Sequence, residues 1–141
     1  MLTGINIYET RNYKSKLDPD TQNPTIFKIG VLDQQIKDWI EDQATSYEIS
    51  SPNPNEPAKA TLSYNRRNTL AVKFGLKGLE NFIDPKTKQP VKFDTINLSK
   101  FGKNYQVVTD EIISMFPREL IRELAGVILN ENTLSGEEIK K

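Results

Sequence analysis

The sequence of 141 residues contains no cysteine and no histidine. Without cysteine, the chain has no disulfides, thiolate zinc sites or thiol nucleophiles. Without histidine, it lacks the commonest general base and the commonest transition-metal ligand. The usual hydrolytic triads and zinc sites are therefore excluded, and only carboxylate, lysine, tyrosine or serine chemistry remains. We expect a protein that is not an enzyme, with no catalytic residues, no metal and no cofactor.

The sequence also lacks a long apolar run. No segment reaches the roughly 20 apolar residues that a membrane-spanning helix needs. Residues 1–14 do not show the basic and then apolar layout of a secretion signal. Hydrophobic residues make up 36% of the chain and charged residues 27%, so the composition is polar but not typical of disorder. We therefore expect a cytoplasmic protein without membrane contact, whose modest core is joined by long loops.

Acidic and basic residues are equal in number, 19 of each, but they are unevenly distributed. Residues 59–103 hold 10 basic and 3 acidic side chains, whereas residues 1–58 hold 5 and 9 and residues 104–141 hold 4 and 7. A basic middle segment between acidic flanks can bind an anionic partner. It can equally be neutralised by those flanks, within one copy or between copies of a homo-oligomer. The balanced total favours neutralisation.

Periodicity and turn signals predict one α+β domain over residues 1–141, dominated by helices and containing two small β-hairpins. In the N-terminal part, 1–48, residues 7–14 are expected to pair with 25–31. Asp33 then suits the N-cap of a helix that runs to about Glu48. Residues 49–58 carry three prolines and are predicted to form an extended linker.

The second part, residues 59–141, is predicted to be mainly helical. A helix is expected over 58–77, with Gly78 as its left-handed C-terminal cap. Residues 82–93 are predicted to form the second hairpin, turning on Asp84-Pro85.

Four features are predicted for the C-terminal third of the chain. Residues 94–104 are expected to be irregular. Thr109 suits the cap of a short helix, and Pro117 suits the first position of a longer helix over 118–132. Ser135 and Glu138 have the spacing of a capping box.

Two carboxylates, Asp18 and Asp20, hint at a calcium loop. Pro19 lies between them, and no glutamate stands at the twelfth position from Asp18. Since both features break the calcium-loop pattern, we interpret the pair as part of a turn.

The basic segment supplies most of the candidate partner surface. Four cations near Tyr64, Phe74 and Phe82 could bind a nucleic-acid backbone while the aromatic rings stack on bases. Against this, Phe74 fits the buried stripe of its helix, and the isoelectric point is about 6.3. The candidate surface comprises Arg66, Arg67, Lys73, Lys77, Leu79, Phe82 and Phe93.

Four stretches, in this order, resemble a family of small proteins from the tail-gene region of tailed bacteriophages, described as tail-assembly-chaperone-like. Their most distinctive unit is a G-L-K-G-aromatic-x-N-F pattern followed by a turn and V-x-F. Leu79 stands where the family has an aromatic residue. The stretches are TIFKIGVLD (25–33), VKFGLKGLENF (72–82), PVKF (90–93) and PRELIRELAGVILNENTLSGEE (117–138).

The resemblance implies a non-enzymatic phage protein that binds a tape-measure protein or a tail-tube subunit during tail assembly, in the host bacterial cytoplasm. It also implies that residues 75–93 form a structural hinge, with Leu79, Phe82 and Phe93 packed beneath its turn. One alternative is a virion structural component of the tail or the head–tail junction. Another is a nucleic-acid-binding or host-defence-blocking accessory protein that acts through residues 59–103.

Overall fold

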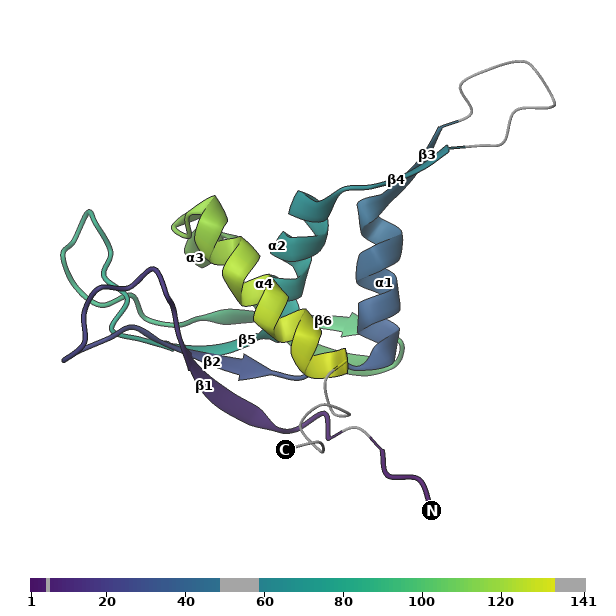
Figure 1. The fold of residues 1–141 in the computed structure, drawn as a ribbon, viewed down its shortest axis with the longest axis horizontal. Coiled ribbons are helices and arrows are strands. Elements are labelled where there is room, and N and C mark those ends of the chain that lie inside the picture. Colours follow the sequence, from purple (N-terminus) through teal and green to yellow (C-terminus); the bar gives the residue numbers. More distant parts are fainter. Residues whose placement is uncertain (5, 49–58, 134–141) are drawn as a thin grey trace.

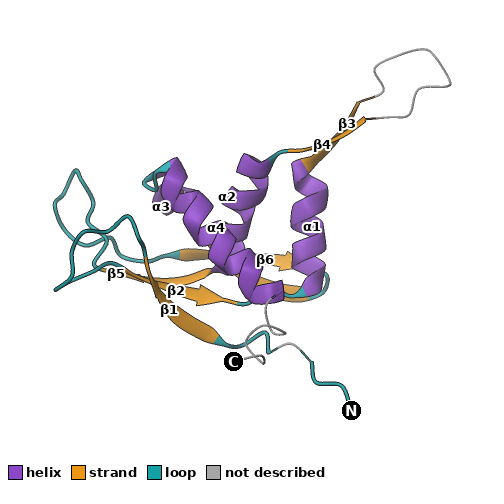
Figure 2. Cartoon of the chain, in the orientation of Figure 1, coloured by secondary structure: helices purple, strands orange, loops and turns teal. Residues whose placement is uncertain are grey.

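The computed structural model describes residues 1–4, 6–48 and 59–133. Over these residues the chain forms four helices and seven strands in three small sheets (Figures 1 and 2). The helices are α1 (Gln34–Ala44), α2 (Tyr64–Gly75), α3 (Asp110–Ser114) and α4 (Arg118–Thr133). The strands are β1 (Thr10–Lys14), β2 (Ile26–Gly30), β3 (Thr45–Glu48), β4 (Lys59–Leu62), β5 (Leu76–Glu80), β6 (Thr95–Lys100) and β7 (Lys103–Val108). The predicted dominance of helices is wrong, because the fold is 36% helix and 29% strand.

The central sheet is antiparallel and has the order β1-β2-β5. The predicted pairing of residues 7–14 with 25–31 is confirmed over the shorter ranges of β1 and β2. The third strand, β5, was expected to be the end of a helix and a cap. Its register against β2 shifts between Lys28 and Ile29, which marks a bulge.

The sheet has one face against the helices and one face without them, as Figure 1 shows. Phe27 and Ile29 are buried, whereas Lys28 between them is exposed, as the alternation of a half-buried strand requires. Tyr13 lies directly opposite Phe27, so both side chains lie on the helical face. The sheet and the helices therefore form two layers with the core between them.

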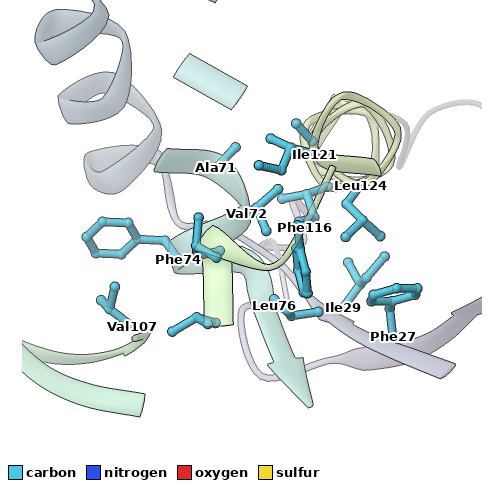
Figure 3. Close-up of a cluster of buried hydrophobic side chains, with 14 of the residues drawn as sticks. Phe27, Ile29, Ala71, Val72, Phe74, Leu76, Val107, Phe116, Ile121 and Leu124 are labelled. Carbon is cyan, nitrogen blue, oxygen red and sulfur yellow. The ribbon is translucent and has the colours of Figure 1, made fainter. Parts of the chain in front are cut away.

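In the helical layer, α2 packs against both α1 and α4. Ile121, Leu124 and Ile128 form the buried stripe of α4, and Phe27 meets Phe116 edge to face with ring centroids 6.0 Å apart (Figure 3). The predicted helix over 118–132 is confirmed, as is the short helix after Thr109. The capping box at 135–138 lies outside the described residues.

One carboxylate joins the C-terminal helix to the N-terminal strand. Glu123 of α4 accepts hydrogen bonds from Tyr13 Oη at 2.5 Å, Ser15 Oγ at 2.5 Å and Lys16 N at 2.8 Å. Ser15 is only 8% exposed, so its hydroxyl needs this partner. Glu123 therefore fixes the end of β1 to α4.

α1 and α2 are both shorter than predicted, because a pair of strands lies between them. Asp33 caps α1 as expected, its carboxylate accepting from Ile36 N at 2.9 Å. The helix stops at Ala44, however, because β3 pairs with β4. Since β4 occupies residues expected to be helical, α2 begins only at Tyr64. The predicted linker over 49–58 lies outside the described residues.

The end of α2 also corrects a prediction. Gly78 is not a left-handed cap, because α2 ends at Gly75 and Gly78 lies within β5 opposite Lys28. A Cβ on Gly75 would lie 2.6 Å from Ile128 Cγ2. Gly75 therefore allows α2 and α4 to approach closely, and this contact explains why a glycine stands at the end of α2.

Two further predictions concern the chain after β5. The hairpin expected over 82–93 is present in reduced form, as one antiparallel bridge of Ile83 with Pro90 and hydrogen bonds from Val91 N to Phe82 O at 2.7 Å and from Asp84 N to Gln89 O at 2.9 Å. Residues 94–104 are not irregular, because most of them belong to the hairpin of β6 and β7. Its turn residues Phe101 and Gly102 have φ values of 54° and 72°, as a two-residue hairpin turn requires.

Candidate binding pocket

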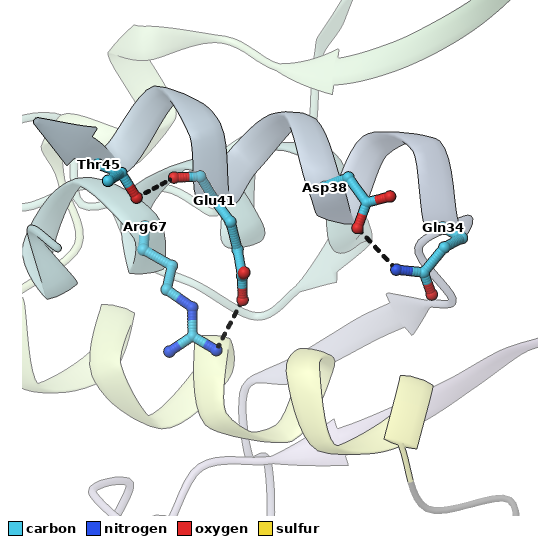
Figure 4. A network of polar contacts seen from close by, with 5 residues as sticks. All are labelled: Gln34, Asp38, Glu41, Thr45 and Arg67. Atoms are coloured by element: carbon cyan, nitrogen blue, oxygen red, sulfur yellow. Dashed lines mark hydrogen bonds and ion pairs between the residues drawn. The ribbon is translucent and has the colours of Figure 1, made fainter. Parts of the chain in front are cut away.

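The four cations of the candidate surface lie on α2 and β5 but do not form one open patch. Arg67 Nη2 lies 3.9 Å from Glu41 Oε1 of α1 (Figure 4), and Lys73 Nζ lies 2.7 Å from Asp110 Oδ1 of α3. These carboxylates come from the acidic N-terminal and C-terminal segments. The two ion pairs thus agree with neutralisation of the basic segment by its own flanks.

The apolar members of the candidate surface lie in the core or packed against it. Leu79 is 9% exposed and belongs to the core. Phe82 is half-buried, with its ring centroid 5.1 Å from that of Phe116, and Phe93 is half-buried against the core. Phe74 is buried between Trp39 and Tyr105. Leu79 and Phe74 are therefore withdrawn from partners, and the proposed base-stacking surface is not assembled.

Asn81, in the turn after β5, has a structural role. It has a φ of 61°, in the left-handed region that asparagine tolerates better than most residues. Its Nδ2 donates to Asn23 Oδ1 at 3.0 Å and to Pro24 O at 3.2 Å, while Thr25 Oγ1 donates to Asn81 O at 2.9 Å. This part of the motif is therefore a structural corner that ties two loops together.

Lys77 lies at the opposite end of the sheet and lines a cavity of about 280 Å³. The cavity brings together the N-terminal arm (residues 1–4 and 6–9), the segment between β2 and α1, the end of α2 and the start of β7. Lys77 is the only member of the predicted surface that lines it. The lining residues are Ile7, Tyr8, Val31, Leu32, Asp33, Ile36, Phe74, Lys77, Lys103, Asn104 and Tyr105.

The Lys77 side chain lies across a glycine of the neighbouring strand. A Cβ on Gly30 would lie 2.9 Å from Lys77 Cγ, so the absence of a side chain there makes room for the lysine stem. Burial lowers the pKa of Lys77. Within the part of the chain that the structure describes, the Lys77 ammonium has no hydrogen bond and no ion pair.

The other charges of the cavity are matched to each other. Burial raises the pKa of Asp33, but hydrogen bonds from Ile36 N and Tyr105 Oη, together with the charge of Lys103, outweigh burial and leave it lowered. Tyr105 Oη donates to Asp33 Oδ2 at 2.7 Å, and Lys103 Nζ lies 3.7 Å from the same oxygen. Burial and the Asp33 carboxylate raise the pKa of Tyr105 to about 12. Among these charged groups, Lys77 is the one for which the described part of the chain supplies no partner.

The N-terminal arm beside the cavity exposes large apolar side chains. Met1 and Leu2 are fully exposed, Tyr8 is 87% exposed and Ile7 is 38% exposed. A turn shapes the arm, since Tyr8 N donates to Asn6 Oδ1 at 3.1 Å. Of these residues, Ile7 and Tyr8 line the cavity, and exposed apolar side chains beside a cavity are a feature of binding sites for other proteins.

Metal chemistry receives no support from the described residues, in which no group of three or more carboxylates could hold an ion. Asp18 instead accepts hydrogen bonds from Asp20 N and Thr25 N, as expected for a turn. No helix in the described parts of the chain is long and apolar enough to cross a membrane.

Comparisons of the chain with protein-family models, with curated proteins and with solved structures gave no match. The local geometry of the arm and the cavity is therefore the basis for assigning a function.

Proposed function

We propose that the chain is a non-enzymatic phage protein that binds other phage proteins during tail assembly, acting as a chaperone in the host bacterial cytoplasm. One observation carries the binding role: an arm with exposed Leu2, Ile7 and Tyr8 borders an open cavity. The partner, a tape-measure protein or a tail-tube subunit, follows from the resemblance of the sequence.

The placement of the resembling stretches supports a division between scaffold and binding surface. Residues 25–33 contain β2, residues 72–82 contain the end of α2 and all of β5, and residues 117–138 contain α4. β2 pairs with β5, and α4 packs on α2. These stretches therefore supply part of the core, together with α1, β7 and α3, whereas the arm lies outside them and is available for recognition.

The nucleic-acid alternative has less support from the geometry. Arg67 and Lys73 are engaged by Glu41 and Asp110, and Phe74 lies in the core. A virion structural role would use the same apolar surface, so it differs from the chaperone role in whether the protein stays in the finished particle.

Co-expression with tail proteins tests the proposal. The tagged chain is captured from cells making a tape-measure or tail-tube subunit, with nuclease present, at low and high salt. We expect capture to survive both treatments, because apolar contacts are not screened by salt. Replacement of Ile7 and Tyr8 by serine is expected to abolish capture. Tyr64→Ser serves as the control, since Tyr64 is exposed on α2, away from the arm.

Two results would change the assignment. Capture of nucleic acid alone, lost as salt rises, would overturn the proposal in favour of the accessory role. Presence of the chain in purified particles, detected by mass spectrometry, would replace the chaperone role with the structural one.

A further inference from the structure

We propose that the cavity beside the arm binds the C-terminal residue of a partner chain, with its carboxylate on Lys77 and its aliphatic side chain against the apolar wall. This inference rests on the proposed function, since it specifies the chemistry that the partner presents.

The Lys77 ammonium makes an anionic group the expected ligand of the cavity. Asp33 is held by its own helix, by Tyr105 and by Lys103, which leaves the Lys77 ammonium as the charge without a counterion among the described residues. The lysine stem lies across Gly30, in the space that a Cβ there would occupy, so the glycine leaves room for Lys77 beside the cavity. A carboxylate in this partly dry site would form a charge-assisted hydrogen bond, which is stronger than a neutral one.

The wall of the cavity selects an aliphatic group. Ile36 and Phe74 contribute core side chains, and Ile7 of the arm contributes a partly exposed one. The volume of about 280 Å³ lies at the lower end of small-molecule pockets. A cavity of this size accepts about one residue rather than a long segment.

The size also decides between a chain terminus and an internal acidic residue. In an extended peptide, successive side chains point to opposite sides. An internal aspartate or glutamate would therefore direct its carboxylate inward and its aliphatic neighbour outward. A terminal leucine, isoleucine or valine presents the carboxylate and the side chain from the same Cα, so one residue satisfies both features of the cavity.

Peptide titration of the intact chain tests this assignment. The probe is an acetylated tetrapeptide, Ser-Ala-Ala-Leu, with a free C-terminal carboxylate, and the matched probe is its C-terminal amide. We expect the acid to shift the backbone amide resonances of Asn104, Tyr105 and Leu32, which line the cavity, and to bind about tenfold more tightly than the amide. Equal affinities of the two peptides, or shifts confined to another surface, would overturn the inference. So would tighter binding of an amidated peptide with an internal aspartate.

Two variants locate the charge. Lys77→Met keeps the stem over Gly30 and removes the ammonium, so it should reduce affinity for the acid about tenfold and leave affinity for the amide unchanged. Lys86→Met is the control, because Lys86 is an exposed lysine in the turn after β5 and lies away from the cavity. Unchanged affinity in Lys77→Met would contradict the inference. The comparison of acid and amide on the unmodified chain does not depend on the folding of any variant.

The failures of the two proposals are distinguishable. Capture of a tail protein that is undiminished by Lys77→Met would reject the terminal-carboxylate site and leave the proposed function standing. Specific binding of the acid peptide without capture of any tail protein would support the site and reject the tail-assembly role.

Discussion

The two ends of the central sheet differ in how far their polar groups are paired within the chain. At the end formed by residues 15–25 and 81–94, side-chain and backbone groups bind each other, through Glu123, Asp18 and Asn81. At the end formed by the arm, residues 31–33 and residues 103–105, the Lys77 ammonium has no partner among the described residues, and apolar side chains are exposed. The first end, which we call the corner, serves stability, whereas the second, the pocket end, retains interactions for a partner. Changes at the corner should destabilise the fold, and changes at the pocket end should not.

Glu123→Ala should have the largest effect, at the corner. The substitution removes three hydrogen bonds and leaves the buried Ser15 hydroxyl without its acceptor. We expect the free energy of unfolding to fall by about 3 kcal/mol, measured by denaturant titration. Glu119→Ala, on an exposed position of the same helix, should change it by no more than about 0.5 kcal/mol. Equal effects of the two would contradict the role of Glu123.

Asn81→Ala should cause the second-largest loss of stability, again at the corner. Alanine at a φ of 61° is strained, and the amide that binds Asn23 and Pro24 is lost. Thermal and denaturant unfolding should show a loss of about 2 kcal/mol. Asn81→Gly relieves the strain but not the lost hydrogen bonds, so it should recover about half of the loss. No difference between alanine and glycine would show that the backbone conformation carries no cost.

At the pocket end, Lys77→Met should change the free energy of unfolding less, and should raise it rather than lower it. Burial of the ammonium without a counterion disfavours the charged form, and methionine fills the same space without a charge. We expect the free energy of unfolding at neutral pH to rise by about 1 kcal/mol. Lys86→Met should leave it within about 0.5 kcal/mol. A loss of stability in Lys77→Met would mean that the pocket end is as structural as the corner.

The smallest expected effect is on the pH dependence of stability, and it again concerns Glu123 at the corner. Burial raises the pKa of Glu123, but the hydrogen bonds from Ser15, Tyr13 and Lys16 outweigh burial and hold it below 4.5. The carboxylate therefore stabilises the fold at neutral pH, and this contribution is lost as pH falls through the folded-state pKa. Below pH 4.5 the stability of the unmodified chain should fall more steeply than that of Glu123→Gln. Parallel pH profiles would refute the linkage.

Local signals in the sequence predicted some elements of the fold correctly. Pro117 and the apolar stripe of residues 118–132 define α4 without reference to the rest of the chain. The strands β6 and β7 were missed because their turn, Phe101-Gly102, lacks the usual Asn-Gly or Asp-Gly pair. β5 was missed because residues 76–80, LKGLE, contain no β-branched residue. Pairing with β2 decides the conformation of β5, and the sequence of residues 76–80 alone does not reveal that partner.

The pocket end was less predictable than the fold. Its lining comes from segments as distant as Tyr8, Asp33, Lys77 and Tyr105, so no spacing along the chain marks it. Lys77 was selected from its charge together with Arg66, although burial and the absence of a counterion are what distinguish it. Those properties arise only when β5, β7 and the arm come together.

The link between Tyr13 and Glu123 spans 110 residues, so it also sets an order of events during synthesis. At the usual 5 to 20 residues per second, β1 leaves the ribosome roughly 5 to 20 s before the helix that fastens it. During that interval the N-terminal strand lacks the carboxylate on which its end is fixed. Contacts of such long range slow folding. The end of β1 is therefore fixed to the helical layer only after α4 has been made.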